Sequence, residues 1–390
     1  MAVNFFIGQN GKARRVRQQF VSVNGKARRV LKGYVGVNGK ARLFYSATTE
    51  CVEHGEAPAL NYVGTEDISA ASTPDYAIFA GGMDSRSSFS EVKSARAYSR
   101  SLTMQNISSL SIEKGHGTAI SFNGRAVFAG GYRGVFMGYK HNDYVDTYDN
   151  SLTKSSLSRL RDTKSHLDCA IVGNHMIFAG GANGAQPVSS PLSSADAYNS
   201  SFTKTSISSL GAARYNLLAA SIGNYAIFAG GYNGSYYSTV DVYDSSLTRT
   251  TGTPLSEPKS SMASGSNESY AIFTGGYGST NKYFLLTDVY DKSLTHTTIS
   301  RSVNGAGAAS VSMGGNIVVS GGFINDSSSG LQDYSTGFYV YDSSLTLAEP
   351  YRLSGKRNRH AMAYVGDYAL AGGGYNGTSY VSSVEYFKFA

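Results

Sequence analysis

Short apolar runs, each ending in a pair of glycines, recur along most of the chain. The first is Tyr76-Ala-Ile-Phe-Ala80 before Gly81-Gly82, and successive pairs lie 45 to 52 residues apart. Apolar runs of this length, bounded by glycine, are typical of β-strands that are buried on both faces. The spacing predicts an all-β chain built from seven repeats. The seven pairs are Gly81-Gly82, Gly130-Gly131, Gly180-Gly181, Gly230-Gly231, Gly275-Gly276, Gly321-Gly322 and Gly373-Gly374.

A second pattern, close to Val-Asp-Val-Tyr-Asp-Ser-Ser-Leu-Thr, follows each glycine pair. The aspartate after the tyrosine is expected to cap a tight turn through its side chain. We name the four strands expected in each repeat a to d, so that the glycine pair ends strand b and the tyrosine lies in strand c. The signature tyrosines are Tyr98, Tyr148, Tyr198, Tyr243, Tyr290, Tyr341 and Tyr386.

Over residues 50–390 the chain resembles the kelch-repeat family. The resemblance rests on the glycine pairs, the tyrosine signature and a basic residue at the start of strand a. It implies a seven-bladed β-propeller with four strands in each blade. Kelch repeats usually carry a tryptophan in strand d, and this chain has none. We therefore expect leucine and isoleucine to fill the outer packing positions.

The last repeat is short, because only four residues follow Tyr386. It lacks a strand d of its own, whereas residues 50–58 precede the first strand a and belong to no repeat. We expect this segment to complete the last blade, because open sheet edges favour aggregation. The propeller is predicted to span residues 47–390.

Residues 1–46 repeat with a different period, of 14 residues. The sequence Asn-Gly-Lys-Ala-Arg begins at Asn10, Asn24 and Asn38. Asn-Gly between runs of alternating apolar residues predicts β-hairpins. A segment of this length has too little core to be stable alone, so we expect it to need a partner or copies of itself.

Charge also separates the two parts. Residues 1–46 hold ten Lys or Arg and no Asp or Glu, which leaves 24 basic and 27 acidic side chains for the rest of the chain. We predict an attachment segment whose candidate contacts are Arg14, Arg15, Arg28, Arg29 and Arg42. Its charges alternate with apolar residues at strand spacing, and the propeller is mildly acidic, so nucleic-acid binding is disfavoured.

Composition excludes several classes of protein. Cys51 and Cys169 are the only cysteines in the 390 residues, so a disulfide framework is excluded. The sequence holds no apolar run of about 18 residues, as a spanning helix would need. The N-terminus lacks the order of basic, apolar and small residues that marks a signal peptide. We expect a soluble protein that does not insert into membranes and is assembled in the cytoplasm.

Length varies between repeats almost entirely in the b–c connections, which lie on one face of a propeller. A constant framework with variable loops on one face is the layout of a binding surface. The loops combine tyrosine with Asn, Gly and Ser, a composition typical of recognition surfaces. Packing of some tyrosines on strand ends is the alternative. The candidate ligand contacts are Tyr132, Phe136, Tyr139, Tyr144, Tyr232, Tyr236, Tyr237, Tyr283, Tyr375 and Tyr380.

Five repeats carry a basic residue 16 positions before the glycine pair. These residues are expected near the central channel on the face of the b–c loops, where they would form a broken basic ring. Two roles remain open: tying neighbouring blades together, as the kelch resemblance implies, or attracting acidic groups of a ligand. The residues are Lys114, Lys164, Arg214, Lys259 and Arg357.

Catalytic motifs are missing from the sequence. The seven histidines show no metal-ligand spacing, and neither a nucleophile elbow, a P-loop nor a dinucleotide fingerprint is present. We expect a protein without enzymatic activity, metal or cofactor.

The basic repeats are similar to N-terminal segments of bacteriophage and prophage tail proteins that join a short repetitive segment to a kelch-like head. This resemblance implies a virion structural protein. Residues 1–46 would attach it to other tail proteins in an oligomeric arrangement, and the b–c loops would bind a glycan or protein of the host surface. The alternative is an intracellular kelch scaffold that binds another protein through the same loops.

Overall fold

A computed structural model describes most of the chain. The described residues are 6–9, 12–15, 19–23, 26–30, 32–37, 40–46, 51–60, 65–84, 90–134, 140–184, 190–279, 283–284, 286–299, 305–326, 331–348 and 351–389. They divide into two compact units, Met1–Glu50 and Cys51–Ala390. Within these residues, no helix reaches the length and apolarity that crossing a membrane requires.

The first unit consists of three antiparallel hairpins. They are β1 (Phe6–Gln9) with β2 (Lys12–Arg15), β3 (Gln19–Val23) with β4 (Lys26–Val30), and β5 (Lys32–Val37) with β6 (Lys40–Ser46). Gln9 pairs with Lys12, Val23 with Lys26 and Val37 with Lys40. The paired strands therefore flank the three Asn-Gly dipeptides of the 14-residue repeat in the sequence, and the dipeptides themselves lie outside the described residues.

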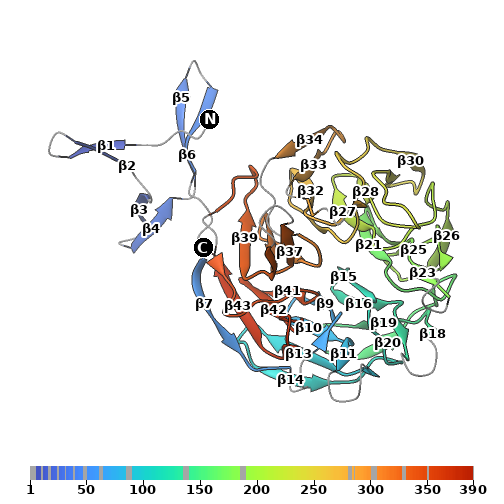
Figure 1. Ribbon diagram of the computed structural model, residues 1–390. Coiled ribbons are helices and arrows are strands. Elements are labelled where there is room, and N and C mark those ends of the chain that lie inside the picture. The colour runs from blue at the N-terminus through green and yellow to red at the C-terminus, as the bar shows by residue number, and fades with distance from the viewer. Residues whose placement is uncertain are drawn as a thin grey trace. The chain divides into compact units, whose positions relative to one another are not determined.

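The second unit is a seven-bladed β-propeller, as the repeats predict. Seven antiparallel sheets of four strands follow one another around a common centre (Figure 1). Strands a to d of the first three blades are β9 (Ser69–Ser72), β10 (Tyr76–Ala80), β13 (Ala95–Ser99) and β14 (Met104–Ile107); β15 (Thr118–Phe122), β16 (Arg125–Ala129), β19 (Val145–Tyr148) and β20 (Lys154–Ser156); β21 (Asp168–Val172), β22 (His175–Ala179), β25 (Ala195–Asn199) and β26 (Lys204–Ile207).

The remaining blades have the same order of strands. They contain β27 (Leu218–Ile222), β28 (Tyr225–Ala229), β29 (Val240–Asp244) and β30 (Arg249–Thr251); β31 (Ala263–Ser266), β32 (Tyr270–Thr274), β33 (Thr287–Asp291) and β34 (His296–Ile299); β35 (Ala309–Met313), β36 (Asn316–Ser320), β39 (Gly337–Tyr341) and β40 (Tyr351–Arg352); β41 (Ala361–Val365), β42 (Tyr368–Gly372), β43 (Val384–Phe389) and β7 (Cys51–Ala57).

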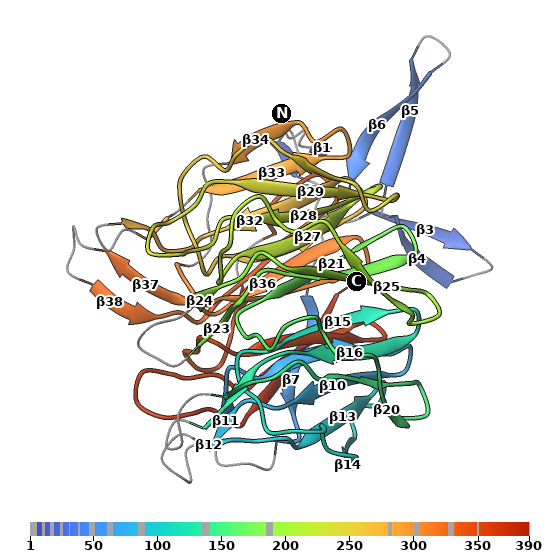
Figure 2. The ribbon, with the colours of Figure 1, turned by 90° about the vertical axis from the view of Figure 1, so that its right-hand side faces the viewer.

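Short ribbons decorate the b–c connections of four blades. They are β11 (Met83–Asp84) with β12 (Ser90–Glu91) and β8 (Thr65–Glu66), β17 (Tyr132–Arg133) with β18 (Lys140–His141), β23 (Ala182–Asn183) with β24 (Ser190–Pro191), and β37 (Phe323–Asp326) with β38 (Leu331–Tyr334). In Figure 2 the ribbons β11–β12, β23–β24 and β37–β38 project from the same side of the propeller. The variable connections therefore share one face.

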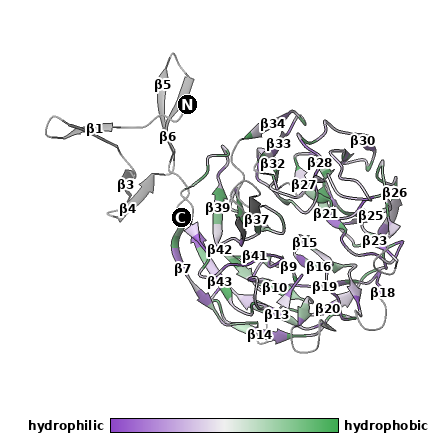
Figure 3. Ribbon diagram, viewed as in Figure 1, coloured by the Kyte–Doolittle hydropathy of each residue, from purple (hydrophilic) through white to green (hydrophobic). Residues whose placement is uncertain are grey.

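The core lies between blades. Each strand b is buried along four of its five residues, whereas strands d such as β14 and β26 are mostly exposed or half-buried. Hydrophobic segments run through the sheets in Figure 3. Seven hydrophobic clusters each join two neighbouring blades, so that every blade is stabilised by burial against both of its neighbours.

The glycine pairs allow close contact with the next blade. Gly130 and Gly131 have φ of 64° and 106°, in the left-handed region that only glycine adopts readily. A Cβ on Gly130 would lie 2.7 Å from the carbonyl oxygen of Lys164, and the amide of Gly131 donates a 2.8 Å hydrogen bond to that same oxygen. The equivalent amide of every blade bonds the next blade in this way.

The signature tyrosines connect adjacent blades. Each of the first five packs edge-on against a phenylalanine of strand b, at 5.7 to 5.9 Å between ring centroids. Their hydroxyls donate hydrogen bonds to backbone carbonyls that follow strand d of the preceding blade, as Tyr148 does to Ser108 at 2.6 Å.

The last blade departs from the expected signature position. Leu370 pairs with Tyr386, and Ala369 pairs with Phe387. In the fourth blade the corresponding strand b alanine, Ala226, pairs with the signature residue Tyr243. Phe387 therefore holds the buried signature position, and the assignment of Tyr386 to it was wrong by one residue.

An N-terminal strand completes the last blade. β7 pairs antiparallel with β43 along its whole length, with Ala57 opposite Val384 and His54 opposite Phe387. The sheet order β41-β42-β43-β7 places the segment near residues 50–58 in the position of strand d. Residues from the two ends of the propeller thus share one sheet.

Candidate functional site

The five basic residues at the starts of strands a are buried inside their own blades. Their relative exposure is 5% for Lys114, 1% for Arg357 and 0% for the other three. Burial lowers the pKa of Lys114 and of Lys164 to about 8. Burial of a cation is costly unless partners compensate, and the blades supply such partners.

A buried carboxylate in strand c lies beside the basic residue in each of these five blades. Arg214 contacts Asp241 at 2.7 Å, and Lys259 contacts Asp288 at 2.7 Å. A second cation or histidine from strand d reaches the same carboxylate from outside, such as His296 on Asp288 at 2.8 Å. We call each such set of three a clamp. The carboxylates are Asp146, Asp196, Asp241, Asp288 and Glu385.

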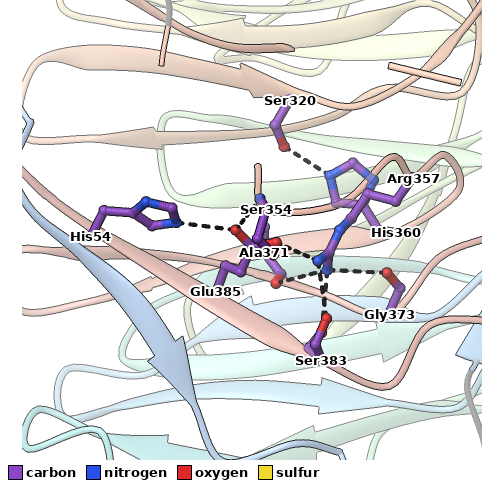
Figure 4. Close-up of polar contacts among 9 residues, drawn as sticks. All are labelled: His54, Ser320, Ser354, Arg357, His360, Ala371, Gly373, Ser383 and Glu385. Carbon is purple, nitrogen blue, oxygen red and sulfur yellow. Dashed lines mark hydrogen bonds and ion pairs between the residues drawn. The ribbon is translucent and has the colours of Figure 1, made fainter. Parts of the chain in front are cut away.

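The clamp of the last blade includes the N-terminal strand (Figure 4). Arg357 lies between Ser383, Gly373 and Glu385, and His54 of β7 reaches Glu385 at 3.0 Å. The amide of Ser354 donates a 2.7 Å hydrogen bond to the same carboxylate. His54 thus occupies the place that Lys154, Lys204, Arg249 and His296 hold in other blades.

The clamps correct the expectation of a basic ring at the channel. The basic side chains bond strand b and strand c of their own blade, for example Arg214 to the carbonyl oxygens of Gly230 and Phe228. They do not belong to the wall of the channel cavity as the described residues form it. Their contacts support the structural alternative, although within blades rather than between them.

The channel ring is formed instead by the residues two positions after the five clamp cations, together with the equivalent Asp67 and Gly307 of the two blades that have no clamp cation. All seven have φ between 49° and 70°. Between six of the seven pairs of adjacent blades, the amide of one ring residue donates a hydrogen bond to the carbonyl oxygen of the ring residue in the preceding blade. These bonds are 2.9 to 3.1 Å long. This channel ring consists of Asp67, His116, His166, Asn216, Ser261, Gly307 and Arg359.

A cavity of about 640 Å³ opens at the channel ring. All seven ring residues line it, together with apolar side chains that follow them in the sequence, such as Leu167, Leu217 and Met262. The volume lies within the range of small-molecule sites, which are concave and combine apolar walls with a few polar groups. Tyr277, Tyr283, Phe323 and Tyr334 complete its wall.

Eleven aromatic residues form a continuous belt around this mouth. Neighbouring rings lie 4.9 to 6.0 Å apart between centroids. The aromatic belt consists, in order, of Tyr132, His166, Tyr215, Tyr232, Tyr236, Tyr277, Tyr283, Phe323, Tyr334, Tyr375 and Tyr380. Most of these rings are half-buried, so each keeps an accessible portion.

Local structure explains the belt. The residue after the glycine pair forms a bridge with a residue across the b–c connection, and in four blades both are aromatic. These pairs are Tyr232 with Tyr236, Tyr277 with Tyr283, Phe323 with Tyr334, and Tyr375 with Tyr380. Because each b–c connection returns to its own blade, the pairs repeat around the axis.

Charged residues occupy the interval between the two ends of the belt, Tyr380 and Tyr132. Asp67 contacts His116 at 2.8 Å, and the exposed guanidinium of Arg359 lies 3.8 Å from Asp67 and 3.7 Å from Glu66. Burial and the charge of Asp67 raise the pKa of Glu66. We call Glu66, Asp67, His116 and Arg359 the polar cluster.

Asp168 adds a carboxylate to the cavity wall. It accepts hydrogen bonds from the Thr118 hydroxyl at 3.0 Å and from the Ala219 amide at 2.8 Å. Burial raises its pKa to about 6. On the belt, burial and the neighbouring Tyr277 raise the pKa of Tyr236 to about 12, so its hydroxyl stays protonated and available for hydrogen bonding.

The structure places six of the ten predicted ligand contacts in the aromatic belt and two elsewhere, and two lie outside the described residues. Tyr132, Tyr232, Tyr236, Tyr283, Tyr375 and Tyr380 lie in the aromatic belt. Tyr144 instead packs under Arg159, whose guanidinium carbon lies 4.1 Å from the ring centroid. Tyr237 is half-buried in the fourth b–c connection, where its amide donates to Gly231. Phe136 and Tyr139 lie outside the described residues.

Sequence reasoning missed the channel ring and several belt residues. His116 and His166 are one repeat apart and stack at 4.2 Å, although they have no metal-ligand spacing. Their constant offset of two from the clamp cation could have identified them. The position after each glycine pair would likewise have added Tyr277 and Phe323. Among the described residues, no group of three or more His, Cys, Asp and Glu is placed to hold a metal ion.

Comparisons with known proteins identify a fold and no family. No protein family matches the sequence, and no curated protein matches it. Among solved structures, the chain is similar to the one titled "Structure of YjhT", with a TM-score of 0.52 and 13% identity over 85% of this chain and 95% of that chain. At this identity the likeness concerns architecture alone. Together with the sheet topology, it establishes the chain as a seven-bladed β-propeller.

Proposed function

We propose that this protein is a non-enzymatic component of a bacteriophage tail or virion surface whose propeller binds a glycan of the host cell. The aromatic belt around the channel cavity would hold the ligand, and residues 1–46 would attach the protein to the particle. The propeller is assigned to the kelch type on the strength of its glycine pairs and signature tyrosines.

The aromatic belt is the observation that carries the binding proposal. Tyrosine rings present flat apolar faces with a polar edge, and they lose little conformational entropy on binding. Sugar rings match this chemistry, since their C–H faces stack on aromatic rings while their hydroxyls need hydrogen-bond partners. Asn216, Ser261 and the polar cluster line or border the same cavity and supply such partners.

The polar groups of the cavity are bonded to neighbouring protein groups, which fixes their positions. Asp67 is held by His116, and His116 stacks on both His166 and Tyr132. Both oxygens of Asp168 accept hydrogen bonds from the protein. Groups positioned in this way serve to orient a ligand.

The virion context rests on the N-terminal unit. Residues 1–46 carry ten basic residues and no acidic ones, and Met1–Glu50 forms a compact unit of its own. Two-stranded hairpins of this size gain stability mainly by packing against other chains. Attachment to an acidic surface of the particle would neutralise the positive charge and would bury the apolar residues that the hairpins cannot cover alone.

Adsorption to bacterial cells tests the proposal. Labelled full-length protein is incubated with cells, with periodate-treated cells and with protease-treated cells. We expect periodate to abolish adsorption, because it cleaves sugar rings, and protease to leave it unchanged. Loss after protease alone would indicate a protein receptor and contradict the glycan proposal, as would failure to adsorb to any strain.

A matched pair of variants locates the contact. Tyr236 contacts Tyr232 and Tyr277 within the belt at 4.9 and 5.6 Å, whereas Tyr144 lies under Arg159. Tyr236→Ala should weaken adsorption about tenfold or more, since interface aromatics often contribute more than 1 kcal/mol. Tyr144→Ala should leave it unchanged. Equal effects of both variants would place the contact elsewhere.

A further inference from the structure

We propose that the channel cavity takes the terminal sugar of an uncharged glycan end-on and discriminates against acidic sugars. This inference rests on the proposed function and adds the class of ligand and its orientation. It concerns the cavity at the channel ring, and only some of the b–c loop residues predicted from the sequence line that cavity.

The cavity has two chemically different sides. Tyr277, Tyr283, Phe323 and Tyr334 form a wall of consecutive belt rings in the fifth and sixth blades. The polar cluster, His166 and Asp168 belong to the other blades around the same opening. A sugar ring likewise has apolar C–H faces and a polar edge of hydroxyls. A sugar placed between the two sides can therefore stack a face on the aromatic wall and donate or accept hydrogen bonds at the polar side.

The position of the cavity on the axis favours end-on binding. Its wall includes one residue of the channel ring from every blade. A glycan lying flat across the face would contact the b–c loops without filling this space. A chain end can enter it, with the next sugar reaching the outer belt, for example Tyr236 and Tyr380.

Charge decides which sugars fit. The groups that line or border the opening include the carboxylates Glu66, Asp67 and Asp168. Arg359 is the guanidinium among them, and it already lies 3.7 to 3.8 Å from Glu66 and Asp67. His116 is engaged by Asp67, and burial followed by the charge of His116 lowers the pKa of His166 well below its usual range. An added carboxylate would lie close to Asp67 and Asp168 in a partly desolvated site, where like charges repel strongly.

Direct titration of the full-length protein tests this inference. Methyl glycosides of glucose, galactose and N-acetylglucosamine are compared with glucuronic acid, galacturonic acid and N-acetylneuraminic acid by saturation-transfer NMR. We expect at least one neutral glycoside to bind at least tenfold more tightly than every acid. Tighter binding of an acid, or no binding of any of these sugars, would overturn the inference.

Asp67→Asn provides the charge control. Asparagine is tolerated at positive φ, and Asn216 already holds the equivalent position of the channel ring at φ 53°. The variant should bring uronic acid affinity to within about threefold of the neutral sugar. Asp75→Asn, at an exposed turn between β9 and β10, should keep the full discrimination. Unchanged discrimination in Asp67→Asn would overturn the role of charge.

The two proposals can fail separately. Periodate-sensitive adsorption with no sugar bound in the cavity would overturn this inference and leave the proposed function intact. Sugar binding in the cavity by a protein that adsorbs to no cell would overturn the proposed function and leave this inference intact.

Discussion

The hydroxyl of Tyr98 donates a 2.7 Å hydrogen bond to the carbonyl oxygen of Pro58. Tyr98 belongs to strand c of the first blade, and Pro58 directly follows β7, the strand d of the last blade. The same bond joins other neighbouring blades, such as Tyr148 to Ser108. Here it also joins the first blade to the last and helps to close the ring.

Removing this hydroxyl should loosen the closure. Tyr98→Phe keeps the packing on Phe79 and loses one hydrogen bond, which costs about 0.5–1.5 kcal/mol of unfolding free energy. We expect faster amide hydrogen exchange in β7 and β43. Tyr148→Phe is the control, because it should lower stability similarly without affecting exchange in those two strands. Equal protection of β7 in both variants would show that closure does not depend on this bond.

Truncation tests the role of β7 as a whole. A chain beginning at residue 51 should melt at the temperature of the full-length propeller. A chain beginning at residue 61 should melt much lower or aggregate, because β43 then presents an open edge and the clamp loses His54. Equal melting temperatures for the two truncations, measured by calorimetry, would contradict the closure.

The clamps should contribute strongly to stability. Arg357→Met removes the main partner of the buried Glu385 carboxylate. Glu385 then keeps only its contacts with His54 and with the amide of Ser354. Breaking a buried pair in this way costs about 3–5 kcal/mol. Arg100→Met removes an exposed pair with Asp75 and should cost under about 1 kcal/mol. Equal losses of unfolding free energy in the two variants, measured by urea unfolding, would show that the buried clamp contributes no more to stability than the exposed pair.

Asp168 gives stability a defined pH dependence. Burial raises its pKa to about 6 from an ordinary value of 3.8, so the folded protein holds the proton more tightly than the unfolded chain. Stability should therefore fall as the pH rises from about 4 to about 6 and stay lowered above that. Asp168→Asn should raise the unfolding free energy by about 1–3 kcal/mol at pH 7.5 and by almost nothing at pH 4. A gain that is the same at both pH values would exclude this titration as the cause.

The N-terminal unit should control assembly. We expect full-length protein to be oligomeric or bound to the particle, and residues 51–390 to be monomeric in sedimentation experiments. The positive charges of residues 1–46 are screened beyond about 8 Å at physiological salt, so self-association through this unit should strengthen with salt, whereas attachment to an acidic surface should weaken. A monomeric full-length protein, with retention of the truncated chain on the particle, would contradict attachment through these hairpins.

Repeats made the fold predictable from the sequence. The spacing of Gly130-Gly131 and its equivalents fixes the number of blades. The turn after the signature tyrosine behaves as expected, since Asp149 accepts hydrogen bonds from the amides of Ser151 and Thr153. The backbone conformation of the leucine in that turn could not be predicted from the sequence. Leu152 has φ of 60°, which its own side chain disfavours, and the backbone hydrogen bonds of the turn hold it there, with its amide donating to Asp149 at 2.9 Å.

The candidate site was predictable only in part. Loop composition pointed to Tyr236 and Tyr283, but it could not show that Tyr334 and Tyr215 join them, because belt neighbours come from different blades. The basic residues carried a clear periodic signal, yet their burial depends on carboxylates about 30 residues away, such as Asp241 for Arg214. The last blade shifted its signature by one residue, and only strand register reveals that Phe387 holds it.

A structure of the full-length protein bound to a glycan released from the cells that it adsorbs to tests the central claim most directly. The account predicts a terminal sugar in the channel cavity, stacked on Tyr283 or its belt neighbours and within hydrogen-bond distance of Asp67 or Asn216. A glycan bound on the outer strands of the blades, with the cavity empty, would contradict it.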